Sequence, residues 1–378
     1  MTQTKIAFSP LKDEPLGAVV TLPEGVTDPA ELDELNFQLL KEALHKYLVL
    51  VIPHQEGLKP QSQYVLTQRF DESSHGLYGH DEKLFHHAKS VLAKDGKCIP
   101  ERPEVICVGN GKFEAQELTG GKDMELEHPT HFTFHKNILS DEEVAQKQTR
   151  YYRWHIDSAL YDLAPPMVTT LLGLVVPETT EKQTIKYTDS DETKEVVKGA
   201  TAFVSGANSF KQLSKEDQDF AMNTTVIYAP HPYIFIAPSK ATDDGLTMVS
   251  EGKETQLDDL PEWDIKKVKK LPLVWSNPTT GEPHLQVHGC CIWKLVNSKT
   301  GETICELEEA REKVHSLMRP GISPELVYCH PWKKGDLAIF FNRGVWHSVT
   351  GEFAEDEKRL MHQCNIASGL DPVCIPAN

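Results

Sequence analysis

A histidine and an aspartate lie two positions apart in the segment Trp154-His155-Ile156-Asp157. In an extended segment both side chains would point to the same face, because side chains alternate along a strand with a period of two. An imidazole and a carboxylate that converge can bind a metal ion, and a second histidine would complete a facial triad that leaves positions open on Fe(II). We expect His347 to be this third ligand, because a turn containing Gly344 precedes it and can direct its ring toward the first two.

An arginine on the following predicted strand strengthens this interpretation. A His-x-Asp pair alone is a weak signal in a chain with 17 histidines. Arg359, however, carries a guanidinium that can bind a carboxylate through two parallel hydrogen bonds. It could hold the far carboxylate of 2-oxoglutarate while the other end of that molecule chelates the metal. Without the upstream histidine, the charged run 355–359 would indicate only a solvated surface arginine.

Other groupings of reactive residues give weaker signals. His128, His131 and His135 could form a second metal cluster, and His284 and His288 have helical spacing. Prolines beside both groups disfavour regular helices, and neither group has a carboxylate or cysteine placed as a zinc site requires. The eight cysteines include no Cys-x-x-Cys pair, so we expect free thiols.

The elements that would position these residues are mostly strands. A continuous apolar, β-branched run predicts a strand at 168–176, and the last strands are expected at 335–341 and 360–367. Further strands are expected at 47–52, 201–205, 225–228, 271–275 and 326–328. They do not alternate with helices as the strands of a parallel sheet would. We therefore predict a mainly β fold with appended helices, built on a double-stranded β-helix (jelly-roll, cupin-like) core.

Helices are expected over residues 28–43, 59–70 and 303–318. Residues 72–150 are polar and irregular, with glycines, histidines and charged runs, and we expect loops and insertions there. The chain has no internal repeat, low-complexity tract or Gly/Ser linker. We therefore expect residues 1–378 to form a single domain that carries this irregular insert.

The composition limits the partners. A net charge of −17 would repel a phosphate backbone, so nucleic acid is not an expected partner. No apolar run approaches the roughly 18 residues that a membrane span needs. The first residues lack the pattern of a secretory signal, so we expect a cytoplasmic protein that acts on a small molecule. A homo-oligomer is left open.

Three segments together resemble the taurine dioxygenase (TauD/TfdA-like) family of Fe(II)- and 2-oxoglutarate-dependent oxygenases, over most of residues 30–370. These segments are 154–157, 199–206 and 332–362. The resemblance implies a jelly-roll enzyme that uses Fe(II), 2-oxoglutarate and O2, with His155, Asp157 and His347 as metal ligands. It also implies that Thr201 joins Arg359 on the far carboxylate of the cosubstrate.

One departure from the family bears on the substrate. Members that oxidise sulfonates have a second arginine four positions after the anchoring one, where this chain has Gln363. A neutral amide would not pair with a sulfonate but, with Asn365 on the same strand face, it can bind amide-like edges. The sequence here is similar to a fungal branch of the family whose members oxidise xanthine at C8 to urate, which implies xanthine as substrate. Further substrate contacts are expected from Lys122 and Glu143, with Asn110 and Gln146 as weaker candidates.

Three alternatives stay open. The substrate could be taurine, another sulfonate, a sulfate ester or another small acid, if a different cation replaces the missing arginine. The chain could also be a metal-binding β-sandwich without turnover. A nucleic-acid demethylase of related fold is the third, and the acidic charge disfavours it.

Overall fold

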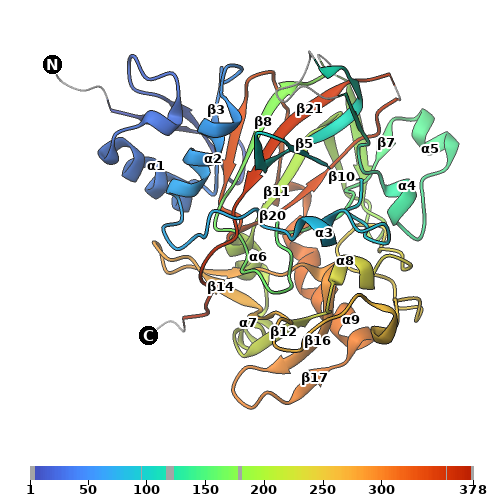
Figure 1. Ribbon diagram of the computed structural model, residues 1–378. Helices are drawn as coiled ribbons and strands as arrows, with labels where there is room; N and C mark the ends of the chain where they lie inside the picture. Colours follow the sequence, from blue (N-terminus) through green and yellow to red (C-terminus); the bar gives the residue numbers. More distant parts are fainter. Residues whose placement is uncertain (1–4, 95, 116–122, 178–180, 355, 376–378) are drawn as a thin grey trace.

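The computed structural model describes residues 5–94, 96–115, 123–177, 181–354 and 356–375. Its largest element is a nine-stranded sheet, the major sheet, in the order β1-β2-β3-β19-β8-β21-β5-β4, with β6 paired to β5 (Figure 1). All its pairs are antiparallel except β2 with β3. The strands are β1 (Ala7–Pro10), β2 (Ala18–Thr21), β3 (Val49–Ile52), β4 (Lys97–Ile99), β5 (Arg102–Phe113), β6 (Met124–Leu126), β8 (Thr169–Val175), β19 (Leu337–Phe340) and β21 (Arg359–Asn365).

A three-stranded antiparallel sheet, the minor sheet, packs against the major one. It consists of β18 (Val327–His330), β11 (Thr201–Ser205) and β20 (Val345–Val349), with β11 in the middle. Phe203 of β11 and Phe340 of β19 are buried between the sheets, with ring centroids 5.2 Å apart. The two sheets therefore share one apolar core, as expected for a β-sandwich.

The remaining strands in the described parts of the chain form three further sheets. They are β7 (Gln148–Thr149), β9 (Lys182–Lys186) and β10 (Thr193–Val197); β12 (Thr224–Tyr228), β13 (Lys270–Pro272), β16 (Ile292–Asn297) and β17 (Thr303–Cys305); and β14 (Val274–Ser276) with β15 (Pro283–Leu285). The strand predicted at 271–275 is thus two strands that belong to different sheets. Helices α6 (Gly206–Gln212), α7 (Lys215–Met222), α8 (Pro232–Phe235) and α9 (Leu307–Met318) lie in the lower half of Figure 1, together with β12, β14, β16 and β17. The mainly β character with appended helices is as predicted.

The first α-helix begins later than the sequence pattern predicts. Asp28 caps only a short 3-10 turn at Pro29–Glu31, and Asp33 then caps α1 (Glu34–Tyr47) by accepting a hydrogen bond from the backbone of Asn36 at 2.8 Å. Helix α2 (Pro60–Arg69) agrees with its prediction and lies against the major sheet. Its buried Gln63 donates to the backbone oxygens of both β8 and β21. This contact fixes α2 behind the strands that carry the site.

The helix predicted at 303–318 is also shorter than expected. Residues Thr303–Cys305 form β17, which pairs with β16, and the helix begins at Leu307. Ile304, assigned by the sequence pattern to the apolar stripe of the helix, is 41% exposed. Local pairing with β16 therefore outweighs helical periodicity at this end.

The prediction that residues 72–150 form loops is wrong for Arg102–Phe113, which form the long strand β5. Besides the short helices α3 (Glu82–Phe85), α4 (His131–Phe134) and α5 (Asp141–Ala145), the region contains β5, which lies between β21 and β4 in the major sheet. Gly109 and Gly111 near its end are typical of turns. A Cβ atom on Gly109 would lie 1.8 Å from the backbone oxygen of Arg359, so this glycine permits a close approach of two strands.

The eight cysteines are free thiols, as expected. Within the described parts of the chain, no helix has the length and apolar character needed to cross a bilayer. The predicted cytoplasmic location, like the single domain, stays a prediction.

Candidate active site

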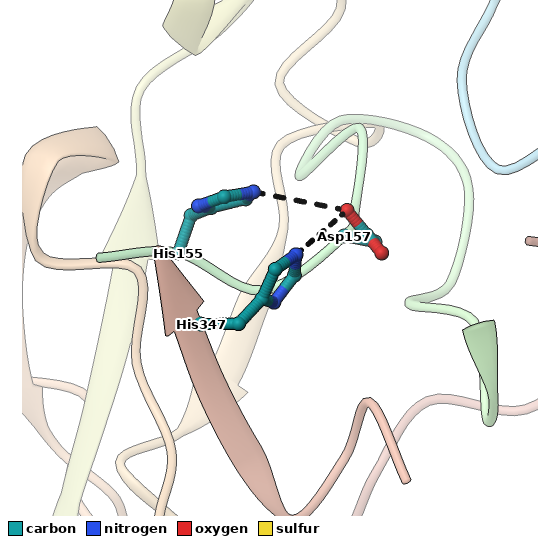
Figure 2. A group of neighbouring side chains, drawn as sticks. All are labelled: His155, Asp157 and His347. Carbon is teal, nitrogen blue, oxygen red and sulfur yellow. Dashed lines mark ion pairs between the residues drawn. The ribbon is translucent and has the colours of Figure 1, made fainter. Parts of the chain in front are cut away.

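The three predicted metal ligands meet at one point (Figure 2). His155 and His347 form an antiparallel bridge, each backbone N–H donating to the other's carbonyl at 3.0 and 2.9 Å. The Nε2 atoms of His155 and His347 lie 3.9 and 3.6 Å from Oδ1 of Asp157. The ligand atoms of the three residues all lie within 4.8 Å of one another, a spacing that one metal ion can bridge. In the described residues, this is the one group of His, Cys, Asp and Glu side chains arranged in this way.

Neighbouring groups fix the orientation of the ligands. His155 donates its Nδ1 proton to the backbone oxygen of Arg153 at 2.9 Å, so its Nε2 carries the lone pair that faces Asp157. Thr169 donates to Oδ2 of Asp157 at 2.6 Å, on the side away from the histidine contacts. Asn342 holds the backbone of Asp157 from both sides, accepting from its N–H and donating to its oxygen at 2.8 Å. The set is therefore preorganised.

The electrostatics of the three residues favour a cation between them. Burial holds the pKa of His155 well below its usual range and lowers the pKa of His347 to about 3, so both imidazoles are neutral. Burial also raises the pKa of Asp157, although His155 and Thr169 act in the opposite direction. Burying a carboxylate between two neutral rings is unfavourable, and a divalent metal bound to all three side chains would stabilise its charge. Two nitrogens and one carboxylate oxygen are the donor set of non-haem Fe(II) oxygenases, so these residues fit that ion.

A cavity of about 120 Å³ next to the triad contains the predicted carboxylate anchors. Arg359 and Thr201 both line it, together with the three metal ligands. Arg359 is only 4% exposed, and burial lowers the pKa of its guanidinium to about 10, so the group stays charged at neutral pH. Thr201 is buried and accepts a hydrogen bond from the indole of Trp332 at 2.9 Å. The cavity thus combines a metal site with a buried cation.

The sequence and the fold match one family. Residues 113–365 match the family described as Taurine catabolism dioxygenase TauD, TfdA family. The chain belongs to this family. It is therefore a dioxygenase, as its sequence predicts.

Several relatives in the TauD/TfdA family are similar over almost the whole chain. The α-ketoglutarate-dependent xanthine dioxygenase xanA of Emericella nidulans is 44% identical over 94% of this chain and 95% of its own. The xanthine dioxygenase xan1 of Schizosaccharomyces pombe is 43% identical over 91% of this chain and 84% of its own. The corresponding protein xan-1 of Neurospora crassa is 44% identical over 92% of this chain and 83% of its own.

Solved structures confirm the predicted jelly-roll core. A taurine dioxygenase from Burkholderia xenovorans has a TM-score of 0.58 over 99% of this chain and 97% of its own, at 17% identity. AAD-2, solved with Mn(II) and N-oxalylglycine, has a TM-score of 0.55 over 97% of this chain and 99% of its own, also at 17% identity.

The predicted substrate residues of this TauD/TfdA protein are not all brought to the cavity. Gln363 of β21 lines it, and its Nε2 lies 3.4 Å from both carboxylate oxygens of Asp157. Asn365 is buried at the end of the same strand and is not part of the lining. Glu143 is partly exposed and completes the capping box of α5 with Ser140. Lys122 lies outside the described residues.

The two weaker candidates have structural contacts. Asn110 donates to the backbone oxygens of Ala354 and Glu357 at 2.9 and 2.8 Å and so ties β5 to the segment before Arg359. Gln146 forms the exposed C-cap of α5. Neither residue lines the cavity.

Some residues of the cavity were missed by the sequence interpretation. Arg153 lines it and lies over the rings of Tyr152 and Tyr233 at 5.4 and 5.6 Å. Arg153 alternates with His155 and Asp157, so the period of two would have placed it on the same face. His128, considered only for a second metal cluster, lines the cavity beside Arg359.

A larger cavity of about 530 Å³ adjoins the inner one. Both are lined by Tyr78, His80, Phe85, Leu92 and Tyr233, so these side chains stand between the two spaces. The outer cavity holds none of the three metal ligands.

Proposed function

We propose that this chain is an Fe(II)- and 2-oxoglutarate-dependent xanthine dioxygenase. The reaction would convert xanthine, 2-oxoglutarate and O2 into urate, succinate and CO2. One observation carries the reaction class: the His155, Asp157 and His347 triad shares a single cavity with the buried cation Arg359. A site that only stored a metal would have no need for a buried guanidinium within the same space.

Two lines of support favour xanthine. The relatives that are 43–44% identical over more than nine-tenths of this chain bear the name xanthine dioxygenase. In addition, Gln363 places a neutral amide in the cavity, where sulfonate-oxidising members are expected to have arginine. Xanthine presents alternating carbonyl and N–H groups at its edge, and a carboxamide can donate to one and accept from the other.

The residues of the chain would act on the bound molecules as follows. His155, Asp157 and His347 would hold Fe(II), which supplies, with O2, the oxidative decarboxylation of 2-oxoglutarate and the oxygenation of the substrate. Arg359 and the Thr201 hydroxyl would bind the far carboxylate of 2-oxoglutarate, because both side chains carry hydrogen-bond donors and line the same cavity.

The substrate would lie between the amide and the cavity wall. Gln363 would orient the purine edge, and its present contacts to Asp157 at 3.4 Å are long enough to be exchanged for better ones. Ile156, Leu171 and Met361 line the same space and would exclude water from the reacting atoms.

Aerobic turnover tests this proposal. Purified protein is incubated with Fe(II), ascorbate, 2-oxoglutarate and xanthine, and urate and succinate are measured together. Equal amounts of both products, lost when any cosubstrate is omitted, are the expected result. Taurine is tested in parallel, and succinate formed faster with taurine than with xanthine would overturn the choice of substrate.

An inactive variant provides the control. Asp157→Ala is expected to lose both products, since the buried site loses its negatively charged ligand. Unchanged turnover in this variant would overturn the assignment of the metal site. Its circular dichroism spectrum and melting temperature show whether the fold is retained.

A further inference from the structure

The partner of Arg359 is a histidine and not an acid. Its Nη1 lies 3.3 Å from Nδ1 of His128, and its Nη2 donates to the backbone oxygen of Gly199 at 3.2 Å. Among the residues that the structure describes, no carboxylate lies within ion-pair distance of this guanidinium. The positive charge of Arg359 is thus oriented by neighbours that do not neutralise it.

The chemistry of the two groups sets the direction of their contact. A guanidinium has five N–H donors and no acceptor, so Nδ1 of His128 must be the acceptor. The ring then carries its single proton on Nε2. Burial and the adjacent Arg359 hold the pKa of His128 well below its usual range, in agreement with a neutral ring.

Other contacts hold the His128 ring in place. It is 5% exposed, its backbone N–H donates to Asn110 at 3.3 Å, and its ring packs edge-on against Phe353 with centroids 4.7 Å apart. Asn110 in turn binds the backbone ahead of Arg359. The ring is therefore fixed relative to the strand that carries the guanidinium.

We propose that His128 is a positioning residue for the cosubstrate, orienting Arg359 while leaving its charge available to the far carboxylate of 2-oxoglutarate. This inference rests on the proposed function. An acid at position 128 would occupy the guanidinium as an ion pair, and an incoming dicarboxylate would have to displace it. A neutral acceptor orients the same donors without that competition.

The second anchor is arranged on the same principle. The indole N–H of Trp332 can only donate, and it donates to Oγ1 of Thr201 at 2.9 Å. The hydroxyl proton of Thr201 must then point away from Trp332. At both anchors, a neighbour fixes the side chain and leaves a donor for the incoming carboxylate.

Two nearly isosteric variants test the role of His128. His128→Gln keeps a neutral acceptor, and His128→Glu replaces it with a charge. Binding of 2-oxoglutarate to Mn(II)-loaded protein is measured by calorimetry, without turnover. We expect the Kd of His128→Gln to stay within about 3-fold of wild type and that of His128→Glu to rise roughly 100-fold, the size of a lost charge-assisted contact. The KM for xanthine at saturating 2-oxoglutarate should stay unchanged in His128→Gln.

A purely structural role makes a different prediction. If the His128 ring only packs on Phe353, both variants lose this packing equally. Equal Kd values for 2-oxoglutarate in the two variants would therefore overturn the inference. His45→Gln and His45→Glu are matched controls, because His45 is 4% exposed and lines neither cavity. These two variants show how far a buried His-to-Glu change by itself lowers the melting temperature.

The inference and the proposed function fail in distinguishable ways. Wild-type protein that does not bind 2-oxoglutarate would overturn the proposed function. Wild-type binding with no difference between the two variants would overturn only the role of His128. If His128→Glu does not fold, His128→Met replaces it, since methionine removes the nitrogen acceptor. We then expect about 10-fold weaker binding than in His128→Gln, and equal binding would overturn the inference.

Discussion

Thr169 donates its hydroxyl to Oδ2 of Asp157 at 2.6 Å, whereas both histidine nitrogens face Oδ1. The two oxygens of this carboxylate therefore have separate tasks. Oδ2 accepts its shortest hydrogen bond from strand β8, and Oδ1 is the oxygen that faces the proposed metal position. Removing a hydrogen bond of this kind, which holds a metal ligand from behind, commonly lowers metal affinity about 10–100-fold.

Removal of that hydroxyl is expected to weaken the metal site. Thr169→Val keeps the shape of the side chain but removes the closest donor to Oδ2, so metal affinity should fall roughly 10-fold or more. Titration with Mn(II) or Co(II) measures the change. Thr170→Val is the matched control, because Thr170 contacts Gln63 and Thr67 instead. Equal loss in the two variants would show that Thr169 has no specific role.

Loss of the cation at position 359 should separate cosubstrate binding from metal binding. Arg359→Gln is expected to raise the KM for 2-oxoglutarate roughly 100-fold, since a charge-assisted contact contributes about 1.5–3 kcal/mol. The KM of Arg359→Lys should lie between those of wild type and Arg359→Gln, because lysine keeps the charge but not the paired donors. Mn(II) affinity without cosubstrate is expected to stay near wild type. A parallel loss of metal affinity would contradict the assignment of Arg359 to the cosubstrate.

Gln363 should affect the substrate instead. Gln363→Ala is expected to lower kcat/KM for xanthine by roughly 10-fold or more, with the Kd of 2-oxoglutarate unchanged. Asn365→Ala is the companion variant, since Asn365 lies on the same strand but not in the cavity lining. A loss in Gln363→Ala alone assigns the contact to that residue, whereas losses in both confirm the predicted role of Asn365. Unchanged kcat/KM in both variants would show that neither amide side chain of β21 contacts the substrate.

Because β5 and β21 approach closely at Gly109, we expect any residue with a side chain at this position to disturb the packing of the two strands. Gly109→Ala would place Cβ 1.8 Å from the backbone oxygen of Arg359, so one strand must move. We expect about 2–4 kcal/mol of lost unfolding free energy, or a folded protein with weakened 2-oxoglutarate binding. Urea unfolding and calorimetry measure the two effects. Gly57→Ala is the control, because a Cβ there would meet no atom within 4 Å.

A titrating pair outside the cavity should make stability depend on pH. His315 of α9 contacts Asp244 at 2.7 Å, and this hydrogen bond raises the pKa of His315. The stabilisation is fully present below the unfolded pKa of about 6.5 and is lost as pH rises through the folded value. Burial opposes ionisation of Asp244, but the hydrogen bond from His315 helps to lower the pKa of this carboxyl. The stabilisation that Asp244 contributes is therefore present above about pH 4 and is lost in acid.

The effect of replacing His315 should therefore depend on the pH of the measurement. His315→Gln is expected to lower the free energy of unfolding more at pH 5.5 than at pH 9. Urea titrations at both values test this, with the exposed His75→Gln as control. The same loss at both values would show that the pair does not act through charge. The contact matters for the site because Gly245, next to Asp244, accepts a hydrogen bond from Trp154 at 3.0 Å.

The convergence of His155, Asp157 and His347 could be predicted because their spacing follows from strand geometry. His155 and Asp157 are separated by one residue, and Arg359 follows His347 on the next strand, so alternation and sequence order are sufficient. Strand β5 could not be predicted, because its glycines serve a close approach between strands that are distant in sequence. Nothing near His128 indicates that the chain places it against Arg359.

Glu143 illustrates a signal that was present and not used. Ser140 and Glu143 have the spacing of a capping box, and the structure shows both of its hydrogen bonds. A residue that caps its own helix is poorly available to a substrate. The motif therefore favours a structural role for this glutamate, and a contact with substrate would require α5 to open.

The bridge between His155 and His347 has a consequence for the order in which the protein matures. The two histidines belong to distant parts of the chain, and Arg359 follows both. A ribosome must therefore finish β20 before the triad exists and β21 before the cosubstrate has its cation. A metal ion that reaches a shorter nascent chain meets only two of the three triad residues. Productive loading of the proposed metal is thus an event that can only follow synthesis of β20.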